Sequence, residues 1–410
     1  MEKKQNVPAL RFQGFSGEWK ERKIEDITGI AYGGGTPSTQ YAGFWQGTIP
    51  WIQSSDVIED ELWSISPRKH ISKEAVKYSA AKVIPKNSIA IITRVGVGKV
   101  AFLPFDYATS QDFLSLSRLK IDERFGTYAV WKKINADAGL VQGTSIKGIT
   151  REEVLAKIIK VPVAENEAKQ IGSFFYQFDK KIGEIKSKIQ KLQQFRQAML
   201  AKLFPREGAA EPELRFRGFS GKWKSQKMKD LGSFLKGKLY SKKNIQTSGV
   251  PLILYGRLYT QYELVIDEVD TFAVPYENSV WSIGGEVIVP ASGETAEDIA
   301  IASVVKRKGI LLGGDLNIIR PNDTVSSVFL ALSISYGHIH NELAKRAQGK
   351  SIVHIHNSDL VQLDIRLPSI EEQKAIGDFF YQLDRYISLQ QKKLKRMQRL
   401  KAALLEKLFV

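Results

Sequence analysis

The sequence predicts a mixed α/β protein made of two related units, each followed by a long α-helix. Two observations predict this architecture. Sequence phrases at the start and end of the two halves repeat in register, and each half ends with a heptad pattern of apolar residues. At 410 residues the chain is also longer than one ordinary hydrophobic core, so at least two domains are expected.

The repeat covers three phrases of sequence. PALRFQGFSGEWKERKIEDI begins at Pro8, and PELRFRGFSGKWKSQKMKDL begins at Pro212, which is 204 residues later (212 − 8). EAKQIGSFFYQFDKKI from Glu167 matches EQKAIGDFFYQLDRYI from Glu372, and QGTSIKGI from Gln142 matches QGKSIVHI from Gln348. Between these phrases the halves share almost nothing that aligns. A repeated frame with two different inserts predicts one arrangement that recognises two different things.

Each unit is expected to begin with a globular part built on apolar strands. SIAIITRV (88–95) in the first unit, and VPLILYG, EVIVPAS and GILLGGDLNIIRP in the second, are bounded by Gly, Pro and Asn. Such runs are typical of strands joined by turns. Residues 328–348 have helical spacing and are expected to form a helix inside the second globular part.

The long helices carry the clearest periodicity. Apolar residues step alternately by four and three, which is the a/d seam of a coiled coil. We expect this helix–helix interface to contain Ile171, Phe175, Phe178, Ile182, Ile185, Ile189 and Leu192 from the first helix, and Ile376, Phe380, Leu383, Ile387, Leu394 and Met397 from the second. Arg196 and Lys401 interrupt the seam at corresponding positions, so we expect an irregularity at one shared level. The alternative is that each stripe packs on its own domain.

Local signals set the expected boundaries. Pro162 and Pro368 precede the helices, and Pro205 and Gly208 follow the first one. The expected division is a first globular domain at 1–160, a first helix at 161–204, a linker at 205–211, a second globular domain at 212–366 and a second helix at 367–410. About 38 helical residues would span roughly 57 Å.

Charge and composition narrow the class of function. The formal net charge of +16 favours a polyanionic partner such as nucleic acid. The absence of cysteine excludes disulfides, thiolate zinc sites and cysteine nucleophiles. No apolar run reaches the length of a membrane span, and the N-terminus does not resemble a signal peptide, so a soluble cytoplasmic protein is expected.

A search for catalytic motifs finds none that is complete. VGVGKVA (95–101) lacks the spacing and the hydroxyl residue of a phosphate-binding loop. No Asn- or Asp-Pro-Pro-aromatic segment marks an adenine methyltransferase, and no Pro-Asp precedes the Glu-x-Lys triplets as in common nucleases. His354 and His356 would share a face of a strand and could chelate a metal, but surface histidines explain them equally. We therefore expect no catalytic residues and no metal site.

These phrases together resemble the specificity subunit of type I restriction–modification enzymes. The resemblance rests on LRF-x-GF-x-G-x-W at each unit's start, GGGTP followed by IPWIQSSDV, the QG-x-S-I phrase, and a long helix ending in KLF. It implies two target-recognition domains joined by an antiparallel coiled coil. It also implies that each domain recognises one half of a split double-stranded DNA target and that the helices set the spacer.

The resemblance also implies partners. The subunit itself is expected to have no catalytic activity and to bind no cofactor. Two modification subunits, which would carry S-adenosylmethionine and methylate adenine, are expected to dock on it. Restriction subunits, which use ATP and Mg²⁺, would complete the assembly. The unlike inserts agree with two unlike half-sites.

Candidate DNA-binding residues are polar or basic side chains on loops that leave apolar strands. In the first unit these are Thr36, Ser38, Gln53, Ser54, Arg94, Lys99 and Gln111, and in the second Lys242, Lys243, Tyr255, Arg257, Ser292, Glu294 and Thr295. The repeated Trp19, Trp223, Phe12 and Phe216 are expected in the core or at interfaces.

Two rival hypotheses remain at this point. A non-specific basic coiled-coil protein would have similar inserts in its two units, whereas these inserts differ. A self-sufficient methyltransferase or nuclease would transfer methyl groups to DNA, or cut it, without any added subunit.

Overall fold

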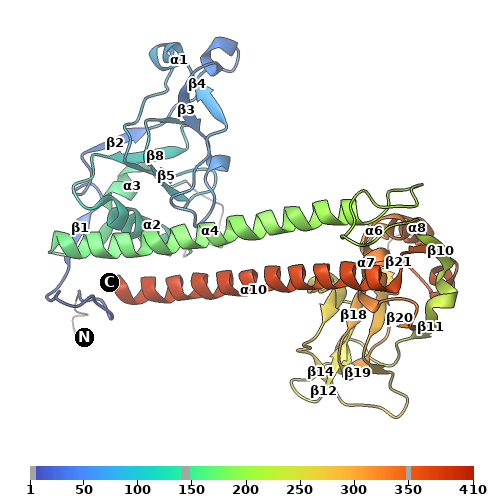
Figure 1. Cartoon of the computed structure of the whole chain (residues 1–410). Coiled ribbons are helices and arrows are strands. Elements are labelled where there is room, and N and C mark those ends of the chain that lie inside the picture. The colour runs from blue at the N-terminus through green and yellow to red at the C-terminus, as the bar shows by residue number, and fades with distance from the viewer. Residues whose placement is uncertain (1–5, 140–147, 348–351) are drawn as a thin grey trace. The chain divides into compact units, whose positions relative to one another are not determined.

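The chain divides into two compact units that share the two long helices. The computed structural model describes residues 6–139, 148–347 and 352–410. Unit 1 comprises Met1–Lys186 and Lys393–Val410, and unit 2 comprises Ser187–Lys392. Helices α4 (Glu165–Leu203) and α10 (Ile370–Leu408), of 39 residues each, contribute to both units (Figure 1). The compact units thus divide each helix internally, and the predicted domain boundaries stay a prediction.

Unit 1 is built on two small sheets and a two-stranded ribbon. Its strands are β1 (Lys20–Lys23), β2 (Ile30–Gly33), β3 (Ile49–Ile52), β4 (Lys69–Ile71), β5 (Ser88–Ile92), β6 (Val100–Leu103), β7 (Ala108–Thr109), β8 (Phe113–Ser117) and β9 (Ile158–Val161). Its other helices are α1 (Lys73–Tyr78), α2 (Glu123–Gly139) and α3 (Arg151–Ala156), with short 3₁₀ turns η1 (Ala42–Trp45) and η2 (Ser54–Asp56). The sheet orders are β2-β8-β5-β6 and β4-β3-β7, and β1 pairs with β9.

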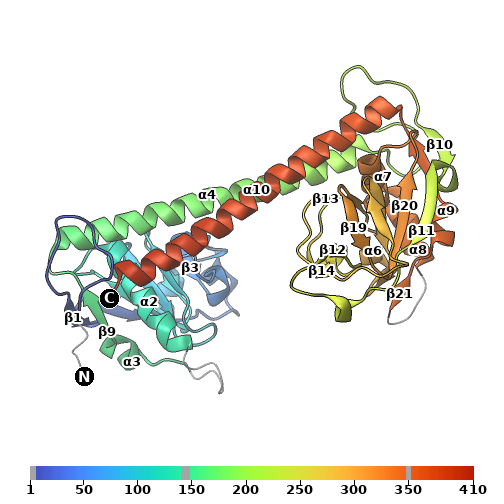
Figure 2. The same cartoon turned by 90° about the horizontal axis from the view of Figure 1, so that it is seen from below.

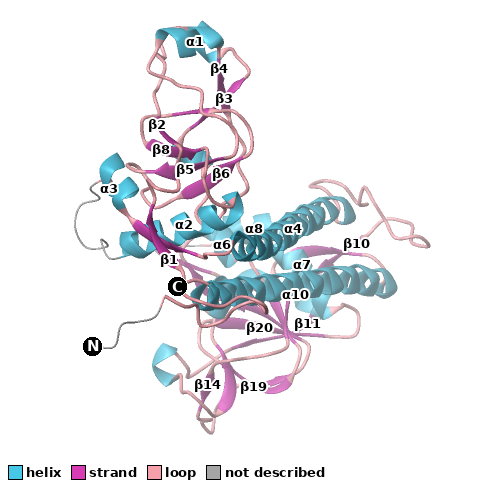
Figure 3. Cartoon of the chain, turned by 90° about the vertical axis from the view of Figure 1, so that its left-hand side faces the viewer, coloured by secondary structure: helices cyan, strands magenta, loops and turns pink. Residues whose placement is uncertain are grey.

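Unit 2 has more strands. They are β10 (Lys224–Lys227), β11 (Gly232–Lys236), β12 (Val250–Ile253), β13 (Val265–Ile266), β14 (Phe272–Ala273), β15 (Trp281–Ile283), β16 (Glu286–Pro290), β17 (Ser292–Gly293), β18 (Ser303–Val305), β19 (Lys308–Leu312), β20 (Leu316–Pro321), β21 (Val353–His354) and β22 (Asp364–Leu367). Its helices are α5 (Arg257–Thr260), α6 (Ala296–Ile299), α7 (Ser327–Ser335), α8 (His338–Arg346) and α9 (Asn357–Val361), with 3₁₀ turns η3 (Met228–Leu231) and η4 (Lys242–Asn244). Figure 3 colours these strands magenta and the helices cyan.

The two inserts have the same sheet topology although their sequences do not align. The order β2-β8-β5-β6 corresponds to β11-β20-β16-β18, with β13 added at the edge. The order β4-β3-β7 corresponds to β14-β12-β19, with β15 added at the edge, and the pairs β3–β7 and β12–β19 are both parallel. The ribbon β1–β9 corresponds to β10–β22. The units are therefore duplicated in fold as well as in frame.

Burial explains why different sequences reach one topology. Every residue of the central strands β5, β8 and β16 is buried. A strand covered on both faces needs apolar residues rather than a strict alternation, so many sequences satisfy it. The predicted strand runs are confirmed in this respect. The helix expected over 328–348 is instead broken between α7 and α8 at Gly337, whose φ of +77° suits glycine.

A buried ion pair ties the start of each unit to its long helix. The Arg11 guanidinium donates to both carboxylate oxygens of Glu167 at 2.8 and 2.7 Å, and to the Gly17 carbonyl at 2.5 Å. Arg215 makes the same contacts with Glu372, at 2.9 and 2.5 Å, and with the Gly221 carbonyl. Glu167 and Glu372 are almost fully buried. The repeated glutamates are therefore structural ligands of arginine.

The two aromatic clusters are equivalent. In unit 1, Phe409 stacks on Phe125 at 5.2 Å and contacts Trp19 and Phe175. In unit 2, the ring stacked on Phe329, at 5.4 Å, is Phe204, which also contacts Trp223 and Phe380. Phe409 directly follows α10 and Phe204 directly follows α4. Each cluster therefore contains the end of one long helix and the beginning of the other. Trp19 and Trp223 are buried as expected, and Phe12 and Phe216 pack against these cores.

Within each unit, α4 and α10 run antiparallel and share one buried ion pair. In unit 1, Lys401 donates to Asp179 at 2.5 Å, and Tyr128 donates to the other carboxylate oxygen at 2.6 Å. In unit 2, Arg196 donates to Asp384 at 2.5 and 2.9 Å. Lys132 of α2 donates to the Leu405 carbonyl of α10 at 3.2 Å. Figure 2 shows α2 beside the C-terminal end of α10.

The polar seam residues are thus ion-pair partners. Asp384 and Lys401 lie 205 residues after Asp179 and Arg196 (384 − 179 and 401 − 196), so the two pairs are copies under the repeat. The expectation of one shared level is wrong, because Arg196 belongs to unit 2 and Lys401 to unit 1. Burial together with the Asp179 carboxylate raises the pKa of the Tyr128 hydroxyl far above its usual range, so this hydroxyl stays a donor.

The predicted interface residues are all buried or half-buried on the helices. Ile171 and Phe175 join the core that contains Leu405 and Phe409, and Ile376 and Phe380 join the core that contains Phe204. Buried seam positions besides these are Ile182, Ile185, Ile189 and Ile387, and half-buried ones are Phe178, Leu192, Leu383, Leu394 and Met397. The apolar stripe of each helix therefore packs in part on the other long helix and in part on a domain core, so the two alternatives are not exclusive.

The described residues test two further expectations only in part. The repeated QG-x-S-I phrase falls largely at 140–147 and 348–351, outside the described residues. Among the described residues, no helix combines the length and the apolarity needed to cross a membrane.

Candidate nucleic-acid interface

Apart from Gln111, which lies between β7 and β8, the candidate DNA-binding residues occupy equivalent connections in the two units. Thr36 and Ser38 follow β2, and Lys242 and Lys243 follow the corresponding β11. Gln53 and Ser54 follow β3, as Tyr255 and Arg257 follow β12. Arg94 and Lys99 lie between β5 and β6, whereas Ser292, Glu294 and Thr295 lie between β16 and β18. The shared topology therefore places candidates of both units on equivalent loops.

Close backbone packing fixes the first of these connections. A Cβ on Gly34 would stand 1.9 Å from the Ser110 carbonyl oxygen, and a Cβ on Gly237 would stand 1.8 Å from that of Gly313. Only glycine fits such an approach. These two glycines are equivalent, because each follows the last residue of β2 or β11. Thr36 and Leu239, two residues further on, therefore hold the same place in the two units.

In unit 1 the structure brings two of the predicted residues together. The exposed Thr36 hydroxyl donates to the Gln111 side-chain oxygen at 2.5 Å. Ser38 is exposed beside them, and its carbonyl accepts from the Trp45 indole at 3.1 Å. Hydrogen-bonded polar groups held on rigid turns are typical of base-edge recognition.

The other predicted residues of unit 1 differ in freedom. Gln53 is half-buried and donates to the Ser55 hydroxyl at 3.0 Å, and Ser54 is half-buried beside it. Lys99 is half-buried and donates to the Val57 carbonyl at 3.2 Å. Arg94 is exposed and makes no hydrogen bond or ion pair to any other residue that the structure describes. The free cation is therefore Arg94 rather than Lys99.

Sequence reasoning missed a cationic hollow in unit 1. It is lined by Trp45, Arg68, Lys69 and His70, among others. The Lys69 ammonium lies 5.5 Å from the centre of the Trp45 ring and 5.7 Å from that of Trp51. A cation beside aromatic faces suits phosphate and base contacts. The only sequence signal was the basic triplet Arg-Lys-His at 68–70, which has no apolar strand before it.

In unit 2 the first connection is rich in lysine. Lys242 and Lys243 are exposed in η4, after the exposed Lys236 and Lys238. Residues 236–249 include no acidic residue. Tyr255 is half-buried and lies 6.3 Å from Tyr259, ring centre to ring centre. This connection therefore offers positive charge without a counter-charge of its own.

Several predicted residues of unit 2 are engaged inside the protein. Arg257 donates to Asp270 at 2.7 Å and to Glu263 at 2.9 Å, with 9% of its side chain exposed. Ser292 is buried and pairs with the His354 imidazole at 3.3 Å. Thr295 caps α6 by accepting from the Asp298 amide at 3.0 Å, and Glu294 is exposed. Their DNA role stays a prediction, and Glu294 and Thr295 are the accessible members.

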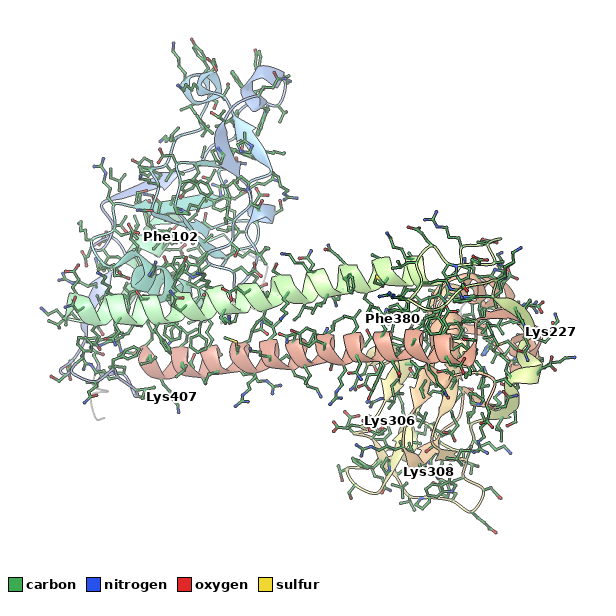
Figure 4. The ribbon with its side chains drawn as sticks, viewed as in Figure 1. Phe102, Lys227, Lys306, Lys308, Phe380 and Lys407 are labelled. Carbon is green, nitrogen blue, oxygen red and sulfur yellow. The ribbon has the colours of Figure 1, made fainter. Side chains whose placement is uncertain are left out.

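Other charges on unit 2 are paired at its surface. Asp267 accepts from Lys306 and from Arg307, both at 2.7 Å. These hydrogen bonds lower the pKa of the Asp267 carboxyl. Figure 4 labels Lys306 and Lys308 on this body. The rings of His354 and His356 stack 6.3 Å apart. No cluster of three or more metal-binding side chains occurs among the residues that the structure describes.

A comparison with protein families decides the class. The model of the "Type I restriction modification DNA specificity domain" matches residues 16–194 and again 220–399. The chain belongs to this family. Both copies of the domain are thus present, in register with the repeat, and the predicted family is confirmed.

Individual relatives agree. The specificity subunit of the type I restriction enzyme MjaIX from Methanocaldococcus jannaschii is 36% identical over 24% of this chain and 23% of the relative. The specificity subunit of an Escherichia coli type I restriction enzyme is 42% identical over 22% of this chain and 21% of that protein. These alignments span less than a quarter of either relative.

A solved structure agrees in fold over the whole length. The crystal structure of a type I restriction–modification S subunit from M. genitalium matches 98% of this chain and 99% of its own, with a TM-score of 0.69. At 16% identity this match concerns the fold alone.

Proposed function

We propose that this chain is a DNA-sequence specificity subunit that recognises a split target with two different surfaces. The observation that carries the proposal is the contrast between a shared topology and different chemistry at equivalent loops. Thr36 and Gln111 form a polar pair after β2 in unit 1, whereas lysines and an exposed leucine follow β11 in unit 2. One scaffold with two unlike surfaces suits two unlike half-sites.

The long helices have a second role in this proposal. They set the spacer between the half-sites and dock two modification subunits. The buried ion pairs on α4 and α10 support a fixed helix register, because each would lose its partner in any other register. The chain itself carries no catalytic group. S-adenosylmethionine, ATP and Mg²⁺ belong to the partner subunits.

The decisive experiment maps modified adenines across the host genome with and without the gene for this chain. The proposal expects one split motif to lose its methylation when the gene is deleted. A parallel assay incubates the purified chain with DNA and a radiolabelled methyl donor. It expects no transfer until a modification subunit is added, and transfer by the chain alone would contradict it.

A further inference from the structure

Unit 2 carries an exposed apolar edge within its lysine-rich connection. Leu239 is 54% exposed, and the exposed Ile245 lies in the same loop, 237–249. Val274 and Tyr276, on the neighbouring segment, are 51% and 49% exposed. Such residues gathered at a loop tip are unusual on a surface, where apolar groups of this size mark contact sites.

Hydrogen bonds hold the two segments against each other. The Tyr240 hydroxyl donates to the Val274 carbonyl at 3.2 Å and accepts from the Tyr276 amide at 3.0 Å. The rings of Tyr240 and Tyr276 stack 5.3 Å apart, and the Asn244 side chain donates to the Tyr276 hydroxyl at 3.2 Å. The exposed apolar side chains thus sit on a braced support rather than on a free loop. Figure 1 shows these loops next to β12 and β14.

The backbone at Leu239 is unusual. Its φ is +68°, a region that L-residues adopt at a cost. Among the described residues, the other positive-φ positions without glycine are Asp60, Asn87, Arg118 and Asp315, so Leu239 alone is aliphatic. A strained, exposed leucine gains nothing for the fold that glycine or asparagine would not supply. This points to a role for the side chain in contact with a partner.

The surroundings favour DNA as that partner. Lys236, Lys238, Lys242 and Lys243 flank the apolar edge, and the two segments that form it, 236–249 and 274–276, contain no acidic residue; one exposed carboxylate, Glu277, follows Tyr276. Phosphates match this charge. The one apolar group on a base edge is the 5-methyl of thymine, in the major groove. Apolar side chains on two adjacent segments can contact methyl groups along a groove. A protein that intercalates between bases would instead present a single apolar wedge.

We propose that Leu239, supported by Ile245 and Val274, makes unit 2 specific for thymine by contacting its 5-methyl group. The inference rests on the proposed function. Thr36, the equivalent residue of unit 1, is polar and hydrogen-bonded, so the methyl requirement belongs to one half-site only.

The test begins with the full chain and a library of random-sequence duplexes. Selection yields the bound motif, and each thymine in it is then replaced by deoxyuridine, which lacks only the methyl. Uracil in the half-site of unit 2 should weaken binding roughly fourfold per contacted methyl, equivalent to about 0.8 kcal/mol. Uracil in the other half-site should change little.

Variants link the effect to the side chain. Leu239→Ala should weaken binding to the thymine duplex by a similar factor and abolish the difference between thymine and uracil. Leu239→Gly should do the same while unfolding no earlier than the parent, because glycine accepts the positive φ. Val163→Ala, at an exposed valine (62%) outside this loop, is the control and should bind like the parent.

Each contrary outcome has its own meaning. A selected motif without thymine in either half, or a uracil effect that persists in Leu239→Ala, overturns the inference and leaves the proposed function standing. Loss of binding in Leu239→Ala with no uracil effect in the parent also overturns it, in favour of a wedge. No enriched motif at all counts against the proposed function itself.

Discussion

At the scale of single residues, Glu167 and Glu372 are nearly buried carboxylates that make the same contacts in both units. Removing one member of a buried ion pair is costly because it leaves a charge without its partner. Glutamine keeps part of the hydrogen bonding, and the Arg11 side chain is 15% exposed, so the loss is smaller than for a fully buried pair. We expect Glu167→Gln and Glu372→Gln each to lower the free energy of unfolding by about 2 kcal/mol.

Urea unfolding of the full chain, followed by tryptophan fluorescence, measures this, since Trp19 donates to Glu167 at 3.3 Å. The matched control is Glu184→Gln, which removes an exposed pair with Lys181. That variant should unfold like the parent. Equal effects of Glu167→Gln and Glu184→Gln would show that the buried pair is not structural.

Lys69 is the residue-scale test of the cationic hollow. Its ammonium lies close to the Trp45 and Trp51 rings, and it is exposed. If the hollow contacts DNA, Lys69→Gln should weaken binding by about tenfold and make the salt dependence shallower by one phosphate contact. Fluorescence anisotropy at several salt concentrations measures both quantities. The exposed Lys20 of β1 supplies the control, since Lys20→Gln should leave both unchanged; an equal loss there would mean that only net charge matters.

At the scale of elements, the ion pairs on α4 and α10 fix the register of the helices. Asp384→Asn leaves Arg196 buried beside a neutral amide, and Asp179→Asn does so for Lys401. We expect each to destabilise the chain by about 2–3 kcal/mol in thermal unfolding. Arg196→Lys should also destabilise, because lysine cannot make the two-point contact of the guanidinium. Lys401→Arg makes the converse exchange and serves as the control. An unchanged melting temperature in Asp384→Asn, Asp179→Asn and Arg196→Lys would show that the ion pairs do not fix the register.

The spacer prediction also belongs to the helices. Deleting residues 184–190 and 390–396 removes one heptad from each helix between its two ion-pair residues. A heptad is about 10.5 Å long and a base pair about 3.4 Å, so the spacer of the target should shorten by roughly three base pairs. Sequencing of methylated sites measures the spacer. An unchanged spacer in a functional assembly would show that the helices do not set it.

At the scale of the whole molecule, we expect the two proposed recognition surfaces to be separable, because the candidate residues of each lie within one unit's insert. Exchanging residues 28–141 for the corresponding insert of a relative should change one half-site of the methylated motif and leave the other. The Arg11–Glu167 pair lies outside the exchanged segment, as does most of the aromatic cluster around Trp19. Phe125 and Tyr128 of α2 lie inside it, so their replacements must stay aromatic. A change in both half-sites would refute the model of two independent surfaces.

The sequence alone determined the features that depend on local pattern. The repeated frame, the two long helices and the apolar strands follow from register, heptad spacing and composition, all of which are visible along the chain. The candidate loop residues were found where strands end. Leu239 and the hollow at Arg68–His70 were missed, because neither a leucine nor a basic triplet carries a local signal of exposure or backbone strain.

Only the tertiary structure decided how distant parts combine. The common topology of the two inserts is set by pairing between strands far apart in sequence. Because buried strands tolerate many apolar sequences, two inserts can share a fold without sharing a recognisable sequence. Asp179 and Asp384 showed nothing along the chain of their pairing with Lys401 and Arg196, because the partner is chosen by packing across helices. The same holds for Phe204 and Phe409, each of which completes a core begun by the other helix.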